Sequence, residues 1–201
     1  MTIDFTPAEL RADALKEIGN IGAGHAATAL SQLLNAKISL AEPRVDVVKF
    51  CDLADRIRYH DRSVAAMHMA VRGDAAGHIL VLFDSEQAME FVRRFIRRVI
   101  GDIRIYDSIA DSTLKELSNI IAGSYLSAIA HLASTRLEPS VPTLSFGSVR
   151  SAFEGLMTTV PDREVFLVES IFRDRDESIG GEFIFIPDAG SIESLLAVFG
   201  V

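Results

Sequence analysis

Cysteine and tryptophan are almost missing from this sequence: Cys51 is the only cysteine, and there is no tryptophan at all. A lone thiol cannot form an intramolecular disulfide, so a disulfide-stabilised scaffold is excluded. Cys51 also lacks neighbours at the spacing of a zinc site. We interpret it as a small core residue rather than a nucleophile.

Long apolar runs and long basic runs are lacking as well. Without a run of about 18 apolar residues or a secretory h-region, we expect a cytoplasmic protein with no membrane insertion. The net charge is −8, and the densest basic cluster is Arg93, Arg94, Arg97 and Arg98. These arginines lie where a helix should end, and cations there complement the helix dipole. Nucleic-acid binding is not expected, because it needs a more extended group of cations.

Clusters of metal-ligating residues are absent from the sequence. The histidines have no paired ligand spacing and are expected to be surface or packing residues: His25, His60, His68, His78 and His131. The segment Gly22-Ala-Gly24 resembles part of a phosphate-binding loop, but it lies inside a helical pattern rather than between a strand and a helix. We therefore predict no metal site and no cofactor bound by this chain.

What the chain does contain is enough apolar material for a sizeable core. Its 201 residues are 49% hydrophobic and 24% charged, as in ordinary globular proteins. This length allows one domain or two small ones. An internal repeat favours a single domain, 1–201, built from two related units at about 6–100 and about 108–201.

The repeat has four marked positions. An Asp or Ser is followed four residues later by a Glu, three residues after that by an Asn, and beyond 22 further residues by a Pro. The first copy supplies Asp13, Glu17, Asn20 and Pro43, and the second, 99 residues later, supplies Ser112, Glu116, Asn119 and Pro142. Repeated apolar residues would only indicate a repeated core. A Glu and an Asn held at one spacing in both copies need a polar reason.

Each copy begins with a pattern typical of a long helix. The first helix is predicted over about 6–34, with Thr6 or Asp4 as its N-cap and Pro7 in the first turn. The second is predicted to begin near Ser108 or Asp111 and to end at about Ser134. Glycines in the middle of the first helix lower its helix propensity and indicate close packing against another backbone. Two equivalent helices in a pseudo-symmetric chain are expected to pack together.

Strands are predicted after each long helix, from β-branched content and partial alternation. A short extended stretch comes first, at 37–40 and 136–138, and three strands follow, at 45–50, 63–71 and 77–83 and at 145–151, 163–172 and 181–186. Each unit ends with a helix, at 85–99 and 191–199. The strand around Phe183 is predicted to be buried, or to form a sheet edge that could bind a partner by strand addition.

The order helix-strand-strand-strand-helix therefore occurs twice. Short connections between consecutive strands imply antiparallel pairing. The predicted fold class is α+β, with an antiparallel sheet and with the two long motif-bearing helices packed together.

The spacing of the motif places its polar residues on one face of each helix, because residues three and four apart are neighbours there. A carboxylate accepts hydrogen bonds from a cation, and a neutral amide both donates and accepts. An Asn can therefore hold a water molecule without competing with it as an acid or base. Two other interpretations remain: such residues are often merely solvated, and a duplicated ancestor could leave matching residues that are no longer used. The proline is interpreted as structural punctuation near the helix.

With these residues in view, the pattern resembles the signature of the CheC family of chemotaxis phosphatases, which includes CheC, CheX and a domain of FliY. Both copies match without a gap, and the resemblance covers essentially the whole chain. Two copies in a chain this short look most like the two-site, CheC-type members. The resemblance implies hydrolysis of the aspartyl phosphate on a CheY-type response regulator.

The resemblance also implies roles for the repeated residues. Asn20 and Asn119 would orient the attacking water, and Glu17 and Glu116 would pair with the lysine of the receiver's active site. The remaining marked positions would have only a supporting role: Asp13, Ser112, Pro43 and Pro142.

Partners and cofactors follow from the same resemblance. Mg²⁺ is expected on the phosphorylated CheY-like receiver, not on this chain, which is expected to be a monomer. CheD, a receptor-modifying deamidase, is a second candidate partner. An interpretation from a different class stays open: a non-enzymatic adaptor that binds CheD or another chemotaxis or motor component.

Overall fold

A computed structural model describes residues 7–57, 61–99, 107–157, 164–175, 180–197 and 200. The helices are α1 (Pro7–Leu34), α2 (Leu53–Arg56), α3 (Ser85–Val99), α4 (Asp107–Ala133), α5 (Val149–Met157) and α6 (Ala189–Leu196), with a 3₁₀ turn η1 (Phe50–Asp52) before α2. The strands are β1 (Ile38–Leu40), β2 (Arg44–Lys49), β3 (Ser63–Gly73), β4 (Gly77–Asp84), β5 (Leu137–Pro139), β6 (Thr143–Ser148), β7 (Glu164–Asp174) and β8 (Gly180–Pro187).

The strands form one antiparallel sheet in the order β1-β7-β8-β4-β3-β5, and β2 and β6 pair with the remaining parts of β7 and β3. The two units share this sheet. Strands β1 and β2 of the first unit pair with β7 of the second, and β5 and β6 of the second pair with β3 of the first. At the centre, β4 of one unit pairs with β8 of the other.

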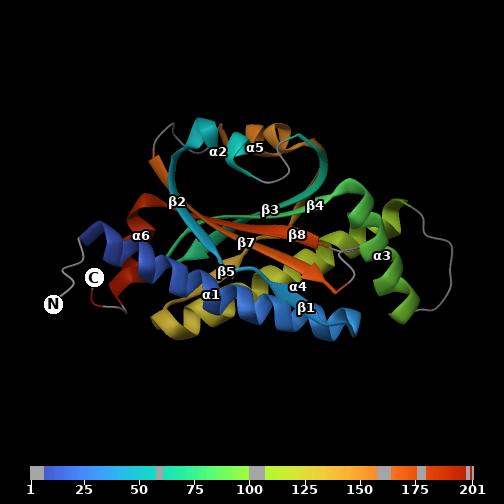
Figure 1. Ribbon diagram of the computed structural model, residues 1–201, viewed down its shortest axis with the longest axis horizontal. Coiled ribbons are helices and arrows are strands. Elements are labelled where there is room, and N and C mark those ends of the chain that lie inside the picture. The colour runs from blue at the N-terminus through green and yellow to red at the C-terminus, as the bar shows by residue number, and fades with distance from the viewer. Residues whose placement is uncertain are drawn as a thin grey trace.

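Helices cover both faces of the sheet, as Figure 1 shows. The long helices α1 and α4 lie antiparallel against one face, while the short helices α2 and α5 lie on the other. Alternate residues of each strand point to opposite faces, so two apolar clusters form. The larger lies between the sheet and the long helices, and the smaller lies beneath α2 and α5. This arrangement leaves the outer surface of α1 and α4 open to solvent.

Both long helices end in the same way. Asn35 and Ser134, at equivalent positions of the repeat, each adopt a left-handed conformation with φ 51°. The next amide donates to the carbonyl five residues back, from Ala36 to Ser31 at 3.2 Å and from Thr135 to Ala130 at 3.0 Å. This closure satisfies the last carbonyls of the helix and turns the chain toward the sheet.

The long helices pack closely at their middle because one of them has no side chain there. A Cβ added to Gly22 would lie 2.6 Å from the ring of Tyr125. That ring is fully buried and lies 4.2 Å, between centroids, from the ring of Phe183. The glycine in α1 thus makes room for the largest buried side chain of α4, as its position in the sequence predicts.

The fold confirms the predicted α+β class, the antiparallel sheet and the paired long helices. One local prediction was wrong. The strand predicted over 145–151 ends at Ser148, because Val149, Phe153 and Leu156 follow a helical period and form the buried side of α5. For the strand around Phe183 the buried alternative is confirmed, since β8 is paired on both sides.

Some predictions lie outside the described residues. These are the N-cap at Thr6 or Asp4, the packing of His60 and the last turn of the helix predicted to end at 199. The arginine cluster does lie in the last turns of α3. There Arg94 binds Glu90 at 3.1 Å and the buried Asp174 at 2.8 Å, which ties α3 to β7.

Candidate functional site

The four repeated polar side chains lie on the open face of the long helices. Glu17 and Asn20 on α1 and Glu116 and Asn119 on α4 are all exposed. None of the four makes a side-chain hydrogen bond or an ion pair with another described residue. An acid and an amide left without an internal partner are available to an external one.

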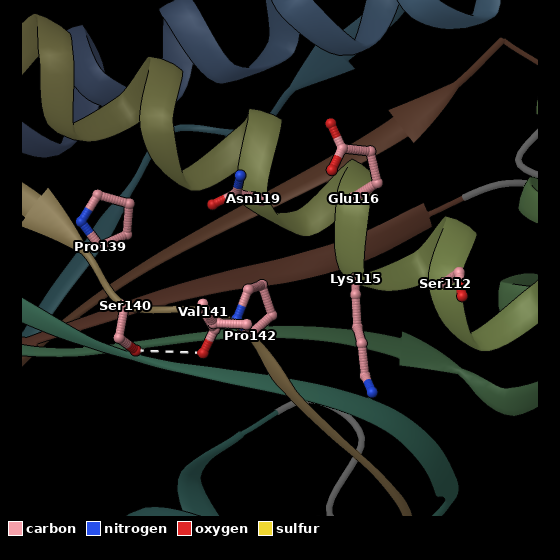
Figure 2. Close-up of a pocket in the computed structure, with 8 residues that line it drawn as sticks. All are labelled: Ser112, Lys115, Glu116, Asn119, Pro139, Ser140, Val141 and Pro142. Atoms are coloured by element: carbon pink, nitrogen blue, oxygen red, sulfur yellow. Dashed lines mark hydrogen bonds between the residues drawn. The ribbon is translucent and has the colours of Figure 1, made fainter.

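In the second copy the motif borders a hollow of about 350 Å³. One wall is α4, and the other is the loop that leads from β5 to β6, as Figure 2 shows. Its lining residues are Ser112, Lys115, Glu116, Asn119, Pro139, Ser140, Val141 and Pro142. Figure 2 shows Glu116 extending upward from the helix and Lys115 extending downward, so the two charged side chains point away from each other. The structure thus brings together all four marked residues of this copy.

The loop that forms this wall is fastened to the sheet. The Ser140 amide donates to the Ala70 carbonyl at 2.8 Å, and the Ala70 amide donates to the Ser140 hydroxyl at 3.0 Å. Pro142 is buried, while Val141 between these two residues is 85% exposed. The hollow therefore has a fixed wall that carries an outward apolar side chain.

In the first copy the corresponding loop lies against α1 in the same manner. The Ala41 amide donates to the Ile171 carbonyl at 2.9 Å, and Pro43 is buried beside Gly19. A Cβ on Gly19 would lie 3.3 Å from Pro43 Cβ and 2.8 Å from Val168 Cγ1. The proline of each copy thus contributes to packing, as predicted, and holds the loop next to the exposed Glu and Asn.

The first position of the motif behaves differently in the two copies. Asp13 Oδ1 lies 3.8 Å from Lys16 Nζ, an exposed pair one helical turn apart. Ser112 instead donates its hydroxyl hydrogen bond to the Ser108 carbonyl at 2.9 Å. Lys115, the counterpart of Lys16, has no ion pair within the described part of the chain.

Outside the motif, the structure reveals a histidine pair that the sequence spacing did not indicate. His68 Nε2 and His78 Nδ1 lie 3.1 Å apart across β3 and β4. Burial, with a smaller contribution from His78, lowers the pKa of His68 to about 4. Burial also lowers the pKa of His78, against the opposing effect of Asp188. Only the register of the β3-β4 hairpin could have placed the two rings together.

The described residues offer no candidate metal site. Among the described residues, no group of three or more His, Cys, Asp or Glu side chains could hold a metal ion. Cys51 is half-buried on η1. Within the same residues, no helix combines the length and the hydropathy that a membrane span requires.

The exposed site offers a particular set of functional groups: one carboxylate, one amide and, at its margin, one ammonium group. None of these is an activated nucleophile. The set can bind a cation, hold a water molecule and attract an anion. Chemistry that needs no more than this is the addition of water to a bond that is already activated.

Comparison with known proteins agrees with this arrangement. The model of the CheC-like family matches residues 10–45 and 109–146, which contain both copies of the motif. The chain is 38% identical over 200 residues to the "CheY-P phosphatase CheC" of Bacillus subtilis, covering 96% of this chain and 95% of the relative. This chain belongs to the CheC-like family. The predicted resemblance is therefore confirmed at the level of the family.

This CheC-like chain is also similar to FliY, both in sequence and in structure. It is 27% identical over 170 residues to the "flagellar motor switch phosphatase FliY" of Bacillus subtilis, covering 80% of this chain but only 41% of that longer protein. The crystal structure of FliY from Thermotoga maritima superimposes with a TM-score of 0.72 at 21% identity, over 98% of both chains. The CheC-like fold of this chain is thus the fold of FliY.

Proposed function

We propose that this protein is a phosphatase that hydrolyses the aspartyl phosphate of a CheY-type response regulator in chemotaxis signalling. The observation that carries the proposal is the pair of Glu-Asn strips on the open face of α1 and α4, each exposed and without a partner among the described residues. The name of the full-length relative, a CheY-P phosphatase, supports the same activity.

The proposed mechanism assigns one task to each side chain. Asn20 or Asn119 holds a water molecule through its amide, which can donate and accept at once. Glu17 or Glu116 binds the lysine of the receiver's active site as a charge pair and so sets the position of the partner. An Asn at this point does not remove a proton. It places the water in line with the phosphorus-oxygen bond that breaks.

Placement alone suffices for this reaction because the substrate is an acyl phosphate. Its leaving group is a carboxylate, and phosphoryl transfer depends mainly on positioning and on charge stabilisation. The receiver brings its own lysine and a Mg²⁺ ion that neutralises charge on the phosphoryl oxygens. What this chain adds is orientation of water, a contribution on the order of a few kcal/mol of transition-state stabilisation.

Several expectations from the sequence belong to the same proposed function. The chain itself binds no metal, acts as a monomer in the cytoplasm and uses the receiver as its main partner. Binding of CheD is a further expectation, drawn from the resemblance alone.

The test is the double substitution Asn20→Ala with Asn119→Ala, measured as the decay of a phosphorylated CheY-type protein. Both side chains are exposed, so the fold should persist, which circular dichroism and thermal unfolding check. We expect decay to return to the spontaneous rate of the receiver.

The matched control replaces Gln32 and His131 with Ala, since these are exposed residues at equivalent positions of the same two helices. This variant should keep full activity. Full activity in the double Asn variant would defeat the proposal.

A further inference from the structure

At the positions that line the hollow of the second copy, and at their equivalents in the first copy, the charge differs twice. Asp13 of the first copy corresponds to Ser112, and Glu42 corresponds to Val141. All four side chains are exposed. The following inference rests on the proposed function, because it concerns how the same two sites meet their substrate.

These equivalent positions are more acidic in the first copy. They carry three carboxylates and one lysine there: Asp13, Glu17, Glu42 and Lys16. Arg44, which lines a hollow with Glu42, is already paired with Asp46 and Glu169. The equivalent positions around Asn119 carry one carboxylate and one lysine: Glu116 and Lys115. The formal charge of these positions is therefore −2 in the first copy and zero in the second.

The equivalent lysines of the two sites, Lys16 and Lys115, also differ in whether an acid pairs with them. Lys16 has Asp13 at 3.8 Å, which partly offsets its charge. Ser112 carries no charge and turns its hydroxyl to the Ser108 carbonyl, so Lys115 has no ion pair among the described residues. Lys115 lines the same hollow as Asn119. An anion that approaches the second site meets a cation that no acid has neutralised.

The second site also offers an apolar contact that the first lacks. Val141 is 85% exposed on a loop that two hydrogen bonds of Ser140 hold against β3. Exposed apolar side chains on a rigid backbone bind a partner at little cost in conformational entropy. The first copy has the carboxylate of Glu42 in this place. Phe146 on β6 and Val47 on β2, exposed at equivalent positions, are apolar in both copies.

The chemistry of the occupant decides between the sites. An aspartyl phosphate brings a phosphoryl group with a charge of about −1.5 to −2 near neutral pH, before the receiver's Mg²⁺ offsets part of it. Like charges at an interface slow the encounter and weaken the complex, whereas a neutral or basic site does not. We propose that the second copy, on α4, is the principal docking site for the phosphorylated receiver. The uncharged Ser112 and Val141 favour docking at the second copy, whereas the carboxylates of Asp13 and Glu42 weaken docking at the first.

The experiment measures each site alone. Asn20→Ala leaves only the second site, and Asn119→Ala leaves only the first. At receiver concentrations below saturation, we expect the second site alone to be faster by about three- to tenfold, the range that two unit charges at a screened surface can supply. The difference should appear mainly in KM, because docking rather than water placement is altered.

Exchange of the charged positions should reverse this order. Asp13→Ser with Glu42→Val, added to Asn119→Ala, should lower KM. Ser112→Asp with Val141→Glu, added to Asn20→Ala, should raise it. Val141→Ala in the Asn20→Ala background separates the loss of apolar contact from the added charge. Higher salt should narrow the difference between the sites, since screening weakens exposed charges.

The failures of the inference and of the proposed function are distinguishable. If the double Asn variant is inactive but the two single variants are equal, or the first site is faster, the inference is wrong and the phosphatase proposal stands. The same conclusion follows if the charge exchanges leave KM unchanged. If the double Asn variant is fully active, the phosphatase proposal itself is wrong.

Discussion

The helices α1 and α4 carry the same polar motif but differ in the residues that surround it. Their motif spacing, their left-handed ends at Asn35 and Ser134, and the proline loops beside them coincide. Their cores and rims do not. Where α1 has Gly22, α4 has Ile121, and where α1 has Ala26, α4 has Tyr125. The comparison shows that backbone geometry around the sites was retained while packing and charge diverged.

The largest effect should come from reversing the charge of the motif Glu. Glu116→Lys would set two ammonium groups against each other at the docked receiver, and we expect a loss of about a hundredfold or more in kcat/KM in the Asn20→Ala background. In the otherwise unchanged protein, Glu17→Lys should cost less than Glu116→Lys, because it leaves the principal site on α4 intact. Steady-state hydrolysis of the phosphorylated receiver measures both. Equal losses would remove the distinction between the two helices.

The next effect concerns the contact between the helices. Gly22→Ala would place a Cβ 2.6 Å from the buried Tyr125 ring, and we expect a loss of about 2–3 kcal/mol in the free energy of unfolding, as for other overpacked sites. Gly123→Ala is the matched control, since a Cβ there meets nothing within 4 Å. It should be neutral or stabilising by up to about 1 kcal/mol through helix propensity. Urea unfolding of both variants would show whether α1 alone is constrained.

A smaller effect should follow from the tyrosine itself. Tyr125 is fully buried, its hydroxyl has no hydrogen-bond partner within the described part of the chain, and burial raises its pKa. Tyr125→Phe keeps the ring that fills the space over Gly22 and removes the unsatisfied hydroxyl. We expect stability to rise by about 1 kcal/mol. A clear fall in the melting temperature would mean that the hydroxyl is bonded.

The smallest expected effect is on the pH dependence of stability, and it concerns polar groups that differ between the two halves of the sheet. Strand β2 places Arg44 against the buried Glu169 at 3.0 Å, whereas the equivalent strand β6 places Thr143 opposite His68. Burial lowers the pKa of His68 to about 4 from an unfolded value of 6.5. Its contribution to stability is therefore complete above pH 6.5 and is lost as the pH falls toward 4.

His68→Gln should accordingly flatten this part of the pH profile. Between pH 7 and pH 4.5 its melting temperature should fall less than that of the wild type, because one group that takes up a proton on unfolding is gone. Parallel profiles would show that His78 and the carboxylates account for the acid sensitivity.

Much of the site was predictable because it depends on local periodicity. The spacing of Glu17 and Asn20, and of their counterparts, fixes a common helix face without any knowledge of the sheet. The exposure of all four side chains confirms the geometric part of that prediction. Their chemical roles remain the proposal made above.

Other features depend on contacts between residues far apart in the sequence. The pairing of β2 with β7 and of β6 with β3 exchanges strands between the units, and no local pattern indicates this exchange. The same applies to the contact of His68 with His78, which needs the hairpin register. Val141 is apolar, yet it is 85% exposed on the loop that borders the hollow. The helix α5 was missed because nine residues give few turns of periodicity.

The most direct test of the central claim follows the decay of a phosphorylated CheY-type receiver mixed with the wild type, with Asn20→Ala, with Asn119→Ala and with both substitutions. The account predicts that the rate falls in that order and that the double variant only matches the receiver alone. A double variant that folds normally and dephosphorylates as fast as the wild type would contradict it.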